Sequence, residues 1–305
     1  MRKILKWLGF ILAGIVVVIL LAAAAAYMMT ESRLNRTYNV QPEALAIPSD
    51  AEAVKRGEHI AIAIAKCVDC HGKNLAGSVM IDDPAIGRLS GSNLTKGQGG
   101  VGSSYTDADW IRAIRHGVGP DGKPLWFMTS QLFYYFSDQD LADVIAYVKS
   151  VPAVDNEPLP NQVGPIGRLL FISGELELTP AEKIDHTGPR PVAPEPGITA
   201  DYGRYLAVTG GCIDCHGPGL SGGHVPGTPP NDPKFPDAAN ITPAGEVGQW
   251  SEEDFIKAMR TGQRPDGTQI DPFMPWPYVG QMTDDELKAV WAYLQTVPAK
   301  PTGTR

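Results

Sequence analysis

The chain opens with an uninterrupted apolar stretch. The 23 residues from Trp7 to Met29 are uncharged and mostly apolar, and three basic residues, the last of them Lys6, precede them. As a helix at 1.5 Å per residue, this stretch would span about 35 Å, enough for the hydrocarbon core of a bilayer. We therefore predict a transmembrane anchor over residues 1–30, with its basic flank in the cytoplasm and the chain after Thr30 outside. A cleaved signal peptide is the alternative, because Ala22–Ala26 offers small-residue cleavage sites.

Two later regions repeat one order of apolar and polar segments. Each reads as a helical stretch, a Cys-x-x-Cys-His segment, a glycine-rich loop, a capped helix, a methionine-bearing loop and a last capped helix. Cys67 and Cys212 lie 145 residues apart, as do Gly117 and Gly262; Asn93 and Asn240 match this offset to within two residues, and after the turn at Gly122 the offset becomes 146. An internal repeat of this length predicts two copies of one domain. We assign domain 1 to residues 50–152 and domain 2 to residues 197–300.

The first capped helix of each copy is marked at both ends. Thr106 and Ser251 each have an aspartate three residues later, which resembles a capping box with Asp in place of Glu. Apolar residues follow with i, i+1, i+4 spacing, which predicts one buried helix face. Gly117 and Gly262 are placed to end the two helices in the left-handed conformation.

The last helix of each copy begins at Ser137 or Thr283, and a valine–proline pair ends it. Tyr147 and Tyr293 lie in the middle of these helices, where their rings could pack on a glycine of the first helix, Gly57 or Gly203. The sequence shows no run of alternating residues that would indicate a sheet. We therefore predict an all-α fold.

Residues 153–196 connect the two copies and contain eight prolines. This density of proline is expected to prevent regular helix. The apolar run Leu169–Ile172 would need to be covered, so we expect the linker to run over both domains and to fix their relative orientation. A floppy spacer is the alternative.

All four cysteines of the chain fall in two Cys-x-x-Cys-His motifs. The motifs are Cys67-Val68-Asp69-Cys70-His71 and Cys212-Ile213-Asp214-Cys215-His216. This spacing is typical of c-type haem attachment, in which two thiols bond covalently to one porphyrin and the histidine becomes the proximal iron ligand. A redox disulfide or a zinc site is the alternative, but zinc needs four ligands and the two cysteine pairs lie 145 residues apart. We predict two covalently bound haem c groups.

The second axial position of each iron decides its chemistry. A histidine there gives a low reduction potential, a methionine raises the potential, and an open position allows ligand binding. Of the eight methionines, only Met128 and Met274 occupy equivalent places, each after a phenylalanine and nine residues before a helix cap. A lone methionine is usually core filler, but this recurrence predicts that the metal ligands are Met128 with His71 and Met274 with His216.

Two other shared positions are less specific. Arg115 and Arg260 could pair with haem propionates, or could favour the C-terminal end of their helices. Asn93 and Asn240 begin Asn-x-Thr segments that we expect to form a loop at the haem edge.

The composition is that of a folded protein, with 43% hydrophobic and 20% charged residues. The net charge of −8 argues against a nucleic-acid partner, which would require a basic surface. An acidic surface suits a redox partner that carries a basic docking patch.

Each half, with a helix leading into Cys67 or Cys212, a distal methionine loop and a C-terminal helix, resembles a class I cytochrome c domain. The pair, with its anchor and proline-rich connector, resembles membrane-anchored dihaem cytochromes c akin to the cytochrome c subunits of bacterial alcohol and gluconate dehydrogenases. It departs from those subunits in having two haem domains and not three. The resemblance implies His/Met ligation, haem domains in the periplasm on the outer side of the bacterial inner membrane, and transfer of single electrons from a dehydrogenase or quinol-linked donor to a terminal acceptor such as an oxidase.

A dihaem enzyme of the peroxidase or thiosulfate dehydrogenase type is the alternative function, since such enzymes also carry two of these motifs. They need one haem whose distal position is open or differently ligated. Because Met128 and Met274 match, we predict an electron-transfer protein, or a subunit of an oxidoreductase complex, with no catalytic residues of its own.

Overall fold

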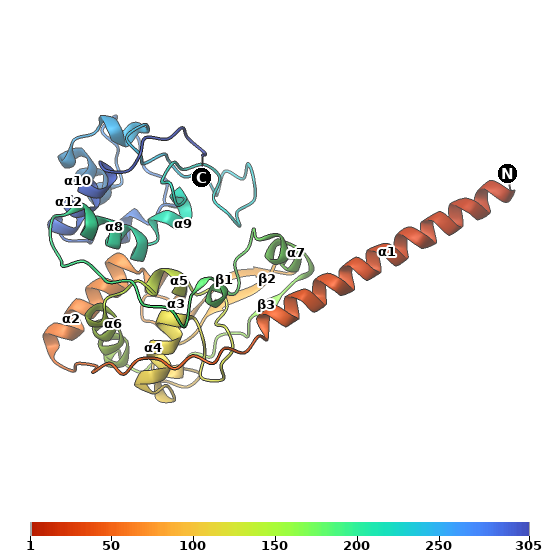
Figure 1. The fold of residues 1–305 in the computed structure, drawn as a ribbon, viewed down its shortest axis with the longest axis horizontal. Coiled ribbons are helices and arrows are strands. Elements are labelled where there is room, and N and C mark those ends of the chain that lie inside the picture. Colours follow the sequence, from red (N-terminus) through yellow and green to blue (C-terminus); the bar gives the residue numbers. More distant parts are fainter. Residues whose placement is uncertain (1, 305) are drawn as a thin grey trace.

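The computed structural model describes residues 2–304. A single long helix, α1 (Arg2–Leu34), projects from a body made of two helical domains (Figure 1). The large apolar side chains of its first twenty residues are exposed. By length and composition, it is the one helix among the described residues that could cross a membrane. The predicted anchor thus coincides with a continuous helix that finds no apolar partner over most of its length.

Domain 1 is built from short helices around a loop-rich centre. It contains α2 (Ala51–His59), the π-helical turn η1 (Ile60–Ile64), α3 (Cys67–His71), the 3₁₀ turn η2 (Val101–Ser103), α4 (Asp107–His116), α5 (Ser130–Phe133) and α6 (Asp138–Ser150). Domain 2 repeats this order with α8 (Ala200–Thr209), α9 (Cys212–His216), the 3₁₀ turn η4 (Glu246–Gln249), α10 (Glu252–Thr261), α11 (Trp276–Val279) and α12 (Asp284–Leu294). The sequence repeat is therefore a structural repeat, and the predicted all-α fold of two tandem domains is confirmed except for one small sheet.

The predicted helix caps are present. Thr106, Ser251 and Thr283 each form a reciprocal capping box with the acidic residue three positions later. Gly117 and Gly262 end α4 and α10 in the left-handed conformation, with φ of 65° and 68°. These ends are fixed by local chemistry, which explains why the sequence alone could locate them.

The first and last helices of each domain cross at a glycine, as predicted. A Cβ atom placed on Gly57 of α2 would lie 1.8 Å from the carbonyl oxygen of Asp143 in α6, and one on Gly203 of α8 would lie 1.8 Å from that of Ala289 in α12. The Cβ atoms of Tyr147 and Tyr293 are the next side-chain neighbours, at 3.0 and 2.9 Å. Only glycine permits this approach of two helix backbones.

A small antiparallel sheet was not predicted, and the statement that no sheet is present is wrong in this detail. Strand β2 (Gly87–Gly91) lies between β1 (Ser78–Asp83) and β3 (Gln162–Val163). Leu89 is the one large side chain that β2 buries, because the buried positions at both of its ends are glycines. An alternating pattern filled with glycine has no apolar signature, so the strand could not be seen in the sequence.

The linker also contains a regular helix, so the prediction that its prolines prevent helix formation is wrong for residues 165–173. Helix α7 (Pro165–Ser173) begins with proline in its first turn, the one helical position that tolerates proline well, and ends at Gly174 with φ of 85°. A short 3₁₀ turn, η3 (Pro180–Lys183), follows. Phe171 of α7 is 1% exposed and packs with Leu34 of α1 in a small apolar cluster. The linker therefore covers part of domain 1 and is not a floppy spacer there.

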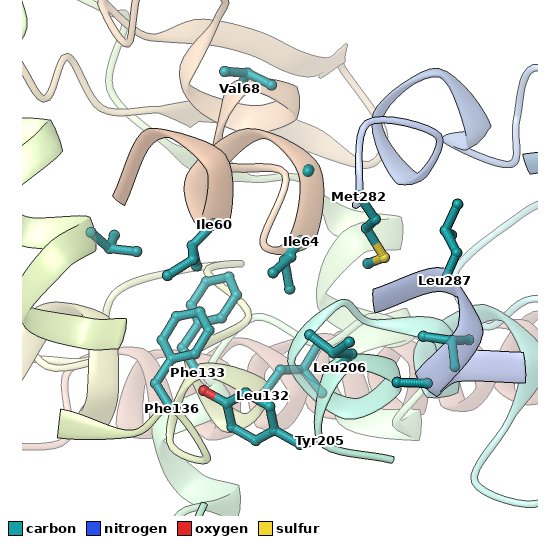
Figure 2. Packing of buried hydrophobic residues seen from close by; sticks show 14 of the residues in the cluster. Ile60, Ile64, Val68, Leu132, Phe133, Phe136, Tyr205, Leu206, Met282 and Leu287 are labelled. Carbon is teal, nitrogen blue, oxygen red and sulfur yellow. The ribbon is translucent and has the colours of Figure 1, made fainter. Parts of the chain in front are cut away.

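One apolar core runs through both domains, as Figure 2 shows. Ile64 of η1 and Leu132 of α5 belong to domain 1, and they share this cluster with Leu206 of α8 and Met282 of domain 2. The two domains are thus packed against each other and not merely tethered.

Polar contacts reinforce this interface. The hydroxyl of Tyr205 in α8 donates to the carboxylate of Asp140 in α6, and it accepts a hydrogen bond from the backbone N–H of Ser137 at 3.1 Å. His59 lies 2.8 Å from the carboxylate of Glu286, and this hydrogen bond raises the pKa of His59. Each contact joins one domain to the other, so the relative orientation of the domains is fixed by side chains far apart in the chain.

Candidate haem-binding sites

Each Cys-x-x-Cys-His motif folds as a single helical turn, α3 or α9. A residue in the left-handed conformation precedes each turn, Lys66 with φ of 52° and Gly211 with φ of 71°. The left-handed residue breaks the preceding helix and starts a new one, which places both cysteines of a motif within one turn. The two motifs thus share one local geometry, although a lysine in domain 1 stands where domain 2 has glycine.

A first cavity, with about 1110 Å³ of space that no protein atom fills, gathers the predicted haem residues of domain 1. Cys67, Cys70, His71 and Met128 all line it. The rest of its wall is largely apolar and aromatic and includes Leu94, Ile114, Trp126, Phe127, Phe136 and Val144. A wall of this kind suits a large apolar group, and part of the space that it borders is open to solvent.

Two polar atoms on this wall support the presence of a bound group. The indole N–H of Trp110 and the hydroxyl of Ser90 are buried and have no hydrogen-bond partner among the described protein atoms. Buried polar groups are rarely left unpaired, and such atoms commonly face a ligand. The residues present therefore fit a porphyrin with polar substituents at its edge.

A second cavity, of about 1300 Å³, gathers the predicted haem residues of domain 2. Cys212, Cys215, His216 and Met274 line it. Arg264 also lies on this wall, and it pairs with Glu246 at 3.0 Å. The structure therefore brings together, site by site, all eight residues singled out from the sequence. Among the described residues, no three His, Cys, Asp or Glu side chains gather as a zinc site would require.

Backbone carbonyls orient both imidazoles. The Nδ1 atom of His71 lies 2.8 Å from the carbonyl oxygen of Ser92, and that of His216 lies 2.7 Å from the carbonyl oxygen of Ala239. Nδ1–H donates to the carbonyl, which leaves the lone pair of Nε2 available to a metal. Burial lowers the pKa of His71, opposed by this hydrogen bond, so the neutral, metal-binding form prevails at neutral pH.

The shared asparagines hold these carbonyls in place. Asn93 directly follows Ser92; its side chain donates to the carbonyl of Val154 at 2.8 Å and accepts from the N–H of Thr95 at 2.9 Å. Asn240, directly after Ala239, makes the equivalent contacts with Lys300 and Thr242. Sequence reasoning found the asparagines but missed the preceding carbonyls, because any residue type can supply a carbonyl.

Both methionine loops have the same local turn. The carbonyl of Met128 accepts from the N–H two residues later at 2.8 Å, and the carbonyl of Met274 does so at 2.7 Å. A short helix, α5 or α11, follows directly. The turn after each methionine is thus shared, although the backbone before it differs, since Phe127 has φ of 61° and Phe273 is not left-handed.

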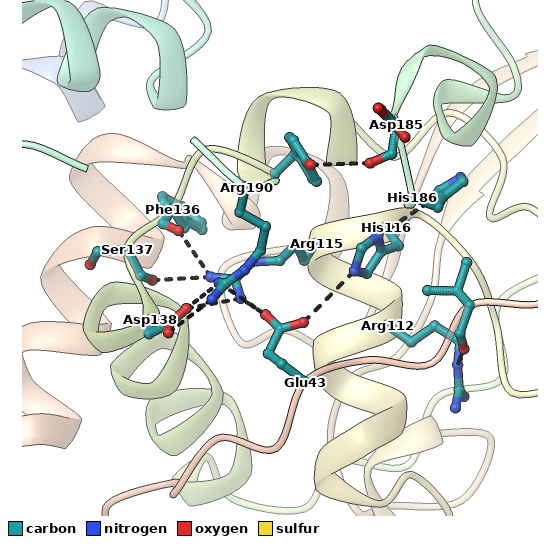
Figure 3. A network of polar contacts seen from close by, with 12 residues as sticks. Glu43, Arg112, Arg115, His116, Phe136, Ser137, Asp138, Asp185, His186 and Arg190 are labelled. Atoms are coloured by element: carbon teal, nitrogen blue, oxygen red, sulfur yellow. Dashed lines mark hydrogen bonds and ion pairs between the residues drawn. The ribbon is translucent and has the colours of Figure 1, made fainter. Parts of the chain in front are cut away.

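The propionate role considered for the shared arginines is not supported. Arg115 is fully buried and donates to the carbonyl of Phe136 at 2.9 Å, beside Glu43 and Asp138 (Figure 3). Arg260 donates to the carbonyl of Met282 at 2.6 Å and lies 2.6 Å from a carboxylate oxygen of Asp284. Both guanidinium groups thus tie the end of α4 or α10 to the start of the last helix of the same domain.

The two cavities have a common wall. Ala65, Lys66, Cys70, Thr129 and Phe133 line both of them. The ammonium group of Lys66 donates to the carbonyl of Ile64 at 2.8 Å and to that of Gly210 in domain 2. Burial lowers the pKa of Lys66. Sequence reasoning missed this wall, because it forms only when the domains pack together.

Comparison with known proteins supports two haem-binding domains. A family model described as "Cytochrome c" matches residues 54–152 and again residues 200–298, together about two thirds of the chain. The "Diheme cytochrome c-type" protein of Cereibacter sphaeroides is 29% identical over 66% of this chain and 68% of its own length. These findings confirm the prediction of two covalently bound haem c groups, while the iron ligands remain a prediction.

Two further relatives are, by name, cytochrome subunits of dehydrogenases. The "Fructose dehydrogenase cytochrome subunit" of Gluconobacter japonicus is 27% identical over 81% of this chain and 53% of its own length. The "Alcohol dehydrogenase (quinone), cytochrome c subunit" of Gluconacetobacter polyoxogenes is 29% identical over 85% of this chain and 59% of its own length. The chain therefore spans only somewhat more than half the length of these relatives.

Proposed function

Because this chain belongs to the cytochrome c family, we propose that it is a membrane-anchored periplasmic dihaem cytochrome that carries single electrons from a dehydrogenase or quinol-linked donor to a terminal acceptor. The observation that carries the proposal is the pair of matched cavities, each lined by one Cys-x-x-Cys-His motif and one methionine, with a common wall between them. A haem c supplies a one-electron couple when bound.

The residues of the chain have separate roles in this proposal. Cys67 and Cys70 in domain 1, like their counterparts in domain 2, hold the porphyrin through thioether bonds. His71 and Met128 would bind the first iron, and His216 and Met274 would bind the second. A histidine and a soft thioether suit iron in both oxidation states, so little rearrangement accompanies transfer of an electron. The apolar walls exclude water, which keeps the surroundings of the iron constant during this change.

The common wall supports passage of electrons between the domains. Phe133 and Thr129 line both cavities, so one thin layer of side chains separates the two sites. The interdomain contacts of Tyr205 and Glu286 keep this layer from opening. An electron that enters either domain would therefore have a short route to the other.

The anchor supplies the location. Helix α1 would place the basic residue Lys6 in the cytoplasm and both haem domains in the periplasm. Tethering to the membrane raises the effective concentration of the cytochrome near membrane-bound partners. Because two relatives are named as subunits of fructose and alcohol dehydrogenases, a membrane dehydrogenase is the donor that we propose. A terminal acceptor, such as an oxidase, would then take up the electrons.

Isolation from detergent-solubilised membranes tests this function. A carrier should copurify with a dehydrogenase, become reduced at both haems when the substrate of that enzyme is added, and leave carbon monoxide unbound. Rapid carbon monoxide binding to a native reduced haem, or turnover with peroxide or thiosulfate, would instead identify a dihaem enzyme. If the protein is isolated without any dehydrogenase, the proposed electron donor is wrong.

A further inference from the structure

We propose that helix α7 of the linker is a second membrane contact, whose exposed aliphatic side chains lie in the headgroup region of the bilayer that α1 crosses. The inference rests on the proposed anchoring role of α1 and adds to it an interfacial surface on domain 1. The partner is a lipid bilayer, recognised by an apolar helix face next to the point where the anchor leaves the membrane.

The level of α7 along α1 is set by two arginines. The guanidinium group of Arg168 in α7 lies 4.3 Å from the ring centroid of Tyr27 and 2.7 Å from the carboxylate of Glu31. The guanidinium group of Arg33 lies 3.8 Å from the ring centroid of Phe171 and donates to its carbonyl at 3.3 Å. Helix α7 therefore packs beside the last two turns of α1 and not farther out on domain 1.

Those two turns are where the apolar part of α1 ends. Met29 is the last apolar residue of the run, and Glu31 and Arg33 are the first charged residues after it. Tyr27 is an aromatic residue of the kind that favours the membrane–water boundary. The segment from Tyr27 to Leu34 rises about 10 Å, which is comparable with the depth of a headgroup layer. A helix packed beside this segment would lie in that layer.

The free face of α7 is apolar. Ile166 and Leu169 are 46% and 51% exposed, and residues three positions apart share one face of a helix. Arg168 is the only charged residue of α7, and Glu31 already pairs with it. Lipid could therefore cover the exposed aliphatic residues without burying an unpaired charge.

Helix α7 is also held firmly on domain 1. A Cβ atom on Gly167 would lie 2.0 Å from the carbonyl oxygen of Ile86, in the turn between β1 and β2, and Arg33 makes an ion pair with Glu182 at 2.7 Å. The first contact holds α7 on the β1–β2 turn of domain 1, and the second ties the end of α1 to η3, which follows α7 in the linker. Helix α7 is thus fixed on domain 1 next to the membrane anchor. This position favours a lipid bilayer over a protein as the partner of the exposed face of α7.

Spin labels on the full-length, haem-loaded protein in phosphatidylcholine–phosphatidylglycerol vesicles would test the inference. Because both native cysteine pairs are consumed by haem, Leu169→Cys provides a single reactive thiol. Val18→Cys in α1 serves as the bilayer reference, and Val192→Cys, at a 95% exposed linker position, serves as the water reference. The measurement is the ratio of collision rates with oxygen, which concentrates in lipid, and with a water-soluble nickel chelate.

We expect the ratio at Leu169→Cys to be several-fold above that at Val192→Cys and to stay below that at Val18→Cys, because Val18 lies at the middle of the apolar run and Leu169 would lie in the headgroup region. A water-like ratio at Leu169→Cys beside a lipid-like ratio at Val18→Cys would overturn the interfacial role of α7 and leave the anchor intact. Water-like ratios at both positions would overturn the anchor and the inference together.

Discussion

The glycine crossing in domain 1 gives a sharp test of the fold that encloses the first haem. In Gly57→Ala, the new methyl group would start 1.8 Å from the carbonyl oxygen of Asp143 and 2.4 Å from its carbonyl carbon. Both are backbone atoms of α6, so no side-chain rotation can relieve the contact. An ordinary carbon–oxygen contact is about 3.3 Å, so the helices would have to separate by roughly 1.5 Å.

Two effects oppose each other in this variant. Alanine is the better helix former by about 1 kcal/mol, whereas overpacking a close contact costs about 1–3 kcal/mol and sometimes more. Since the obstructing atoms are backbone, we expect the upper end of that cost and a net loss of about 2 kcal/mol. For a domain of about 100 residues, this corresponds to a fall in Tm of roughly 8–16 °C.

Thermal unfolding followed by far-ultraviolet circular dichroism and by the haem absorption bands would measure the effect. Gly203→Ala repeats the substitution at the crossing in domain 2, where the built Cβ also lies 1.8 Å from a carbonyl oxygen. Gly197→Ala is the matched control, because a Cβ there meets nothing within 4 Å. If Gly57→Ala melts at the temperature of the unmodified protein or above it, helix propensity has won and the close crossing is refuted.

Three further predictions concern the sites and their surroundings. Met128→Ala should abolish the methionine-to-iron charge-transfer band of one haem in the near infrared, and Met274→Ala that of the other; a spectrum that keeps both bands would disprove the ligand assignment. Lys66→Met removes a cation from the common wall, so the reduced form of each haem loses electrostatic stabilisation. Spectroelectrochemical titration should therefore give lower midpoint potentials for both haems. Unchanged potentials would show that the amine of Lys66 does not affect the haem potentials. Burial, with Arg115 nearby, lowers the pKa of His116 to about 4. Between pH 6.5 and pH 4, the unfolded chain therefore binds a proton at this histidine that the folded protein does not bind. The free energy of unfolding should fall by up to about 3 kcal/mol over this range. Urea unfolding of the unmodified protein and of His116→Gln would measure this, and an equal acid loss in both would assign it to other groups.

Features determined by neighbouring residues could be predicted from the sequence. The caps at Thr106 and Ser251, the helix ends at Gly117 and Gly262, and the two haem motifs each depend on a few adjacent residues. The repeat helped further, because it separated Met128 and Met274 from the other methionines. The comparison of the two copies thus identified the candidate methionines, which a single copy of the domain could not have done.

Features that arise from packing could not be predicted. Strand β2 places glycine at two of its buried positions, and α7 gains its stability from contacts between Phe171 and the end of α1. The carbonyl of Ser92 and the wall residue Lys66 have no sequence signature, because one role needs only a backbone atom and the other needs the second domain in place. Each of these features depends on contacts between segments that lie far apart in the sequence.

The hairpin of β1 and β2 makes two inherited copies unequal. Met80, Ser90 and Gly91 from this hairpin help to close the first cavity, whereas the second cavity is lined at the corresponding place by a loop, with Val225 and Pro236, that carries a bridge between Gly223 and Ala238. Two identical copies would give two haems of equal reduction potential, and an electron would then favour neither of them. Unequal surroundings would remove that equality without a change in either Cys-x-x-Cys-His motif, so a bias in the direction of electron flow can evolve in peripheral loops.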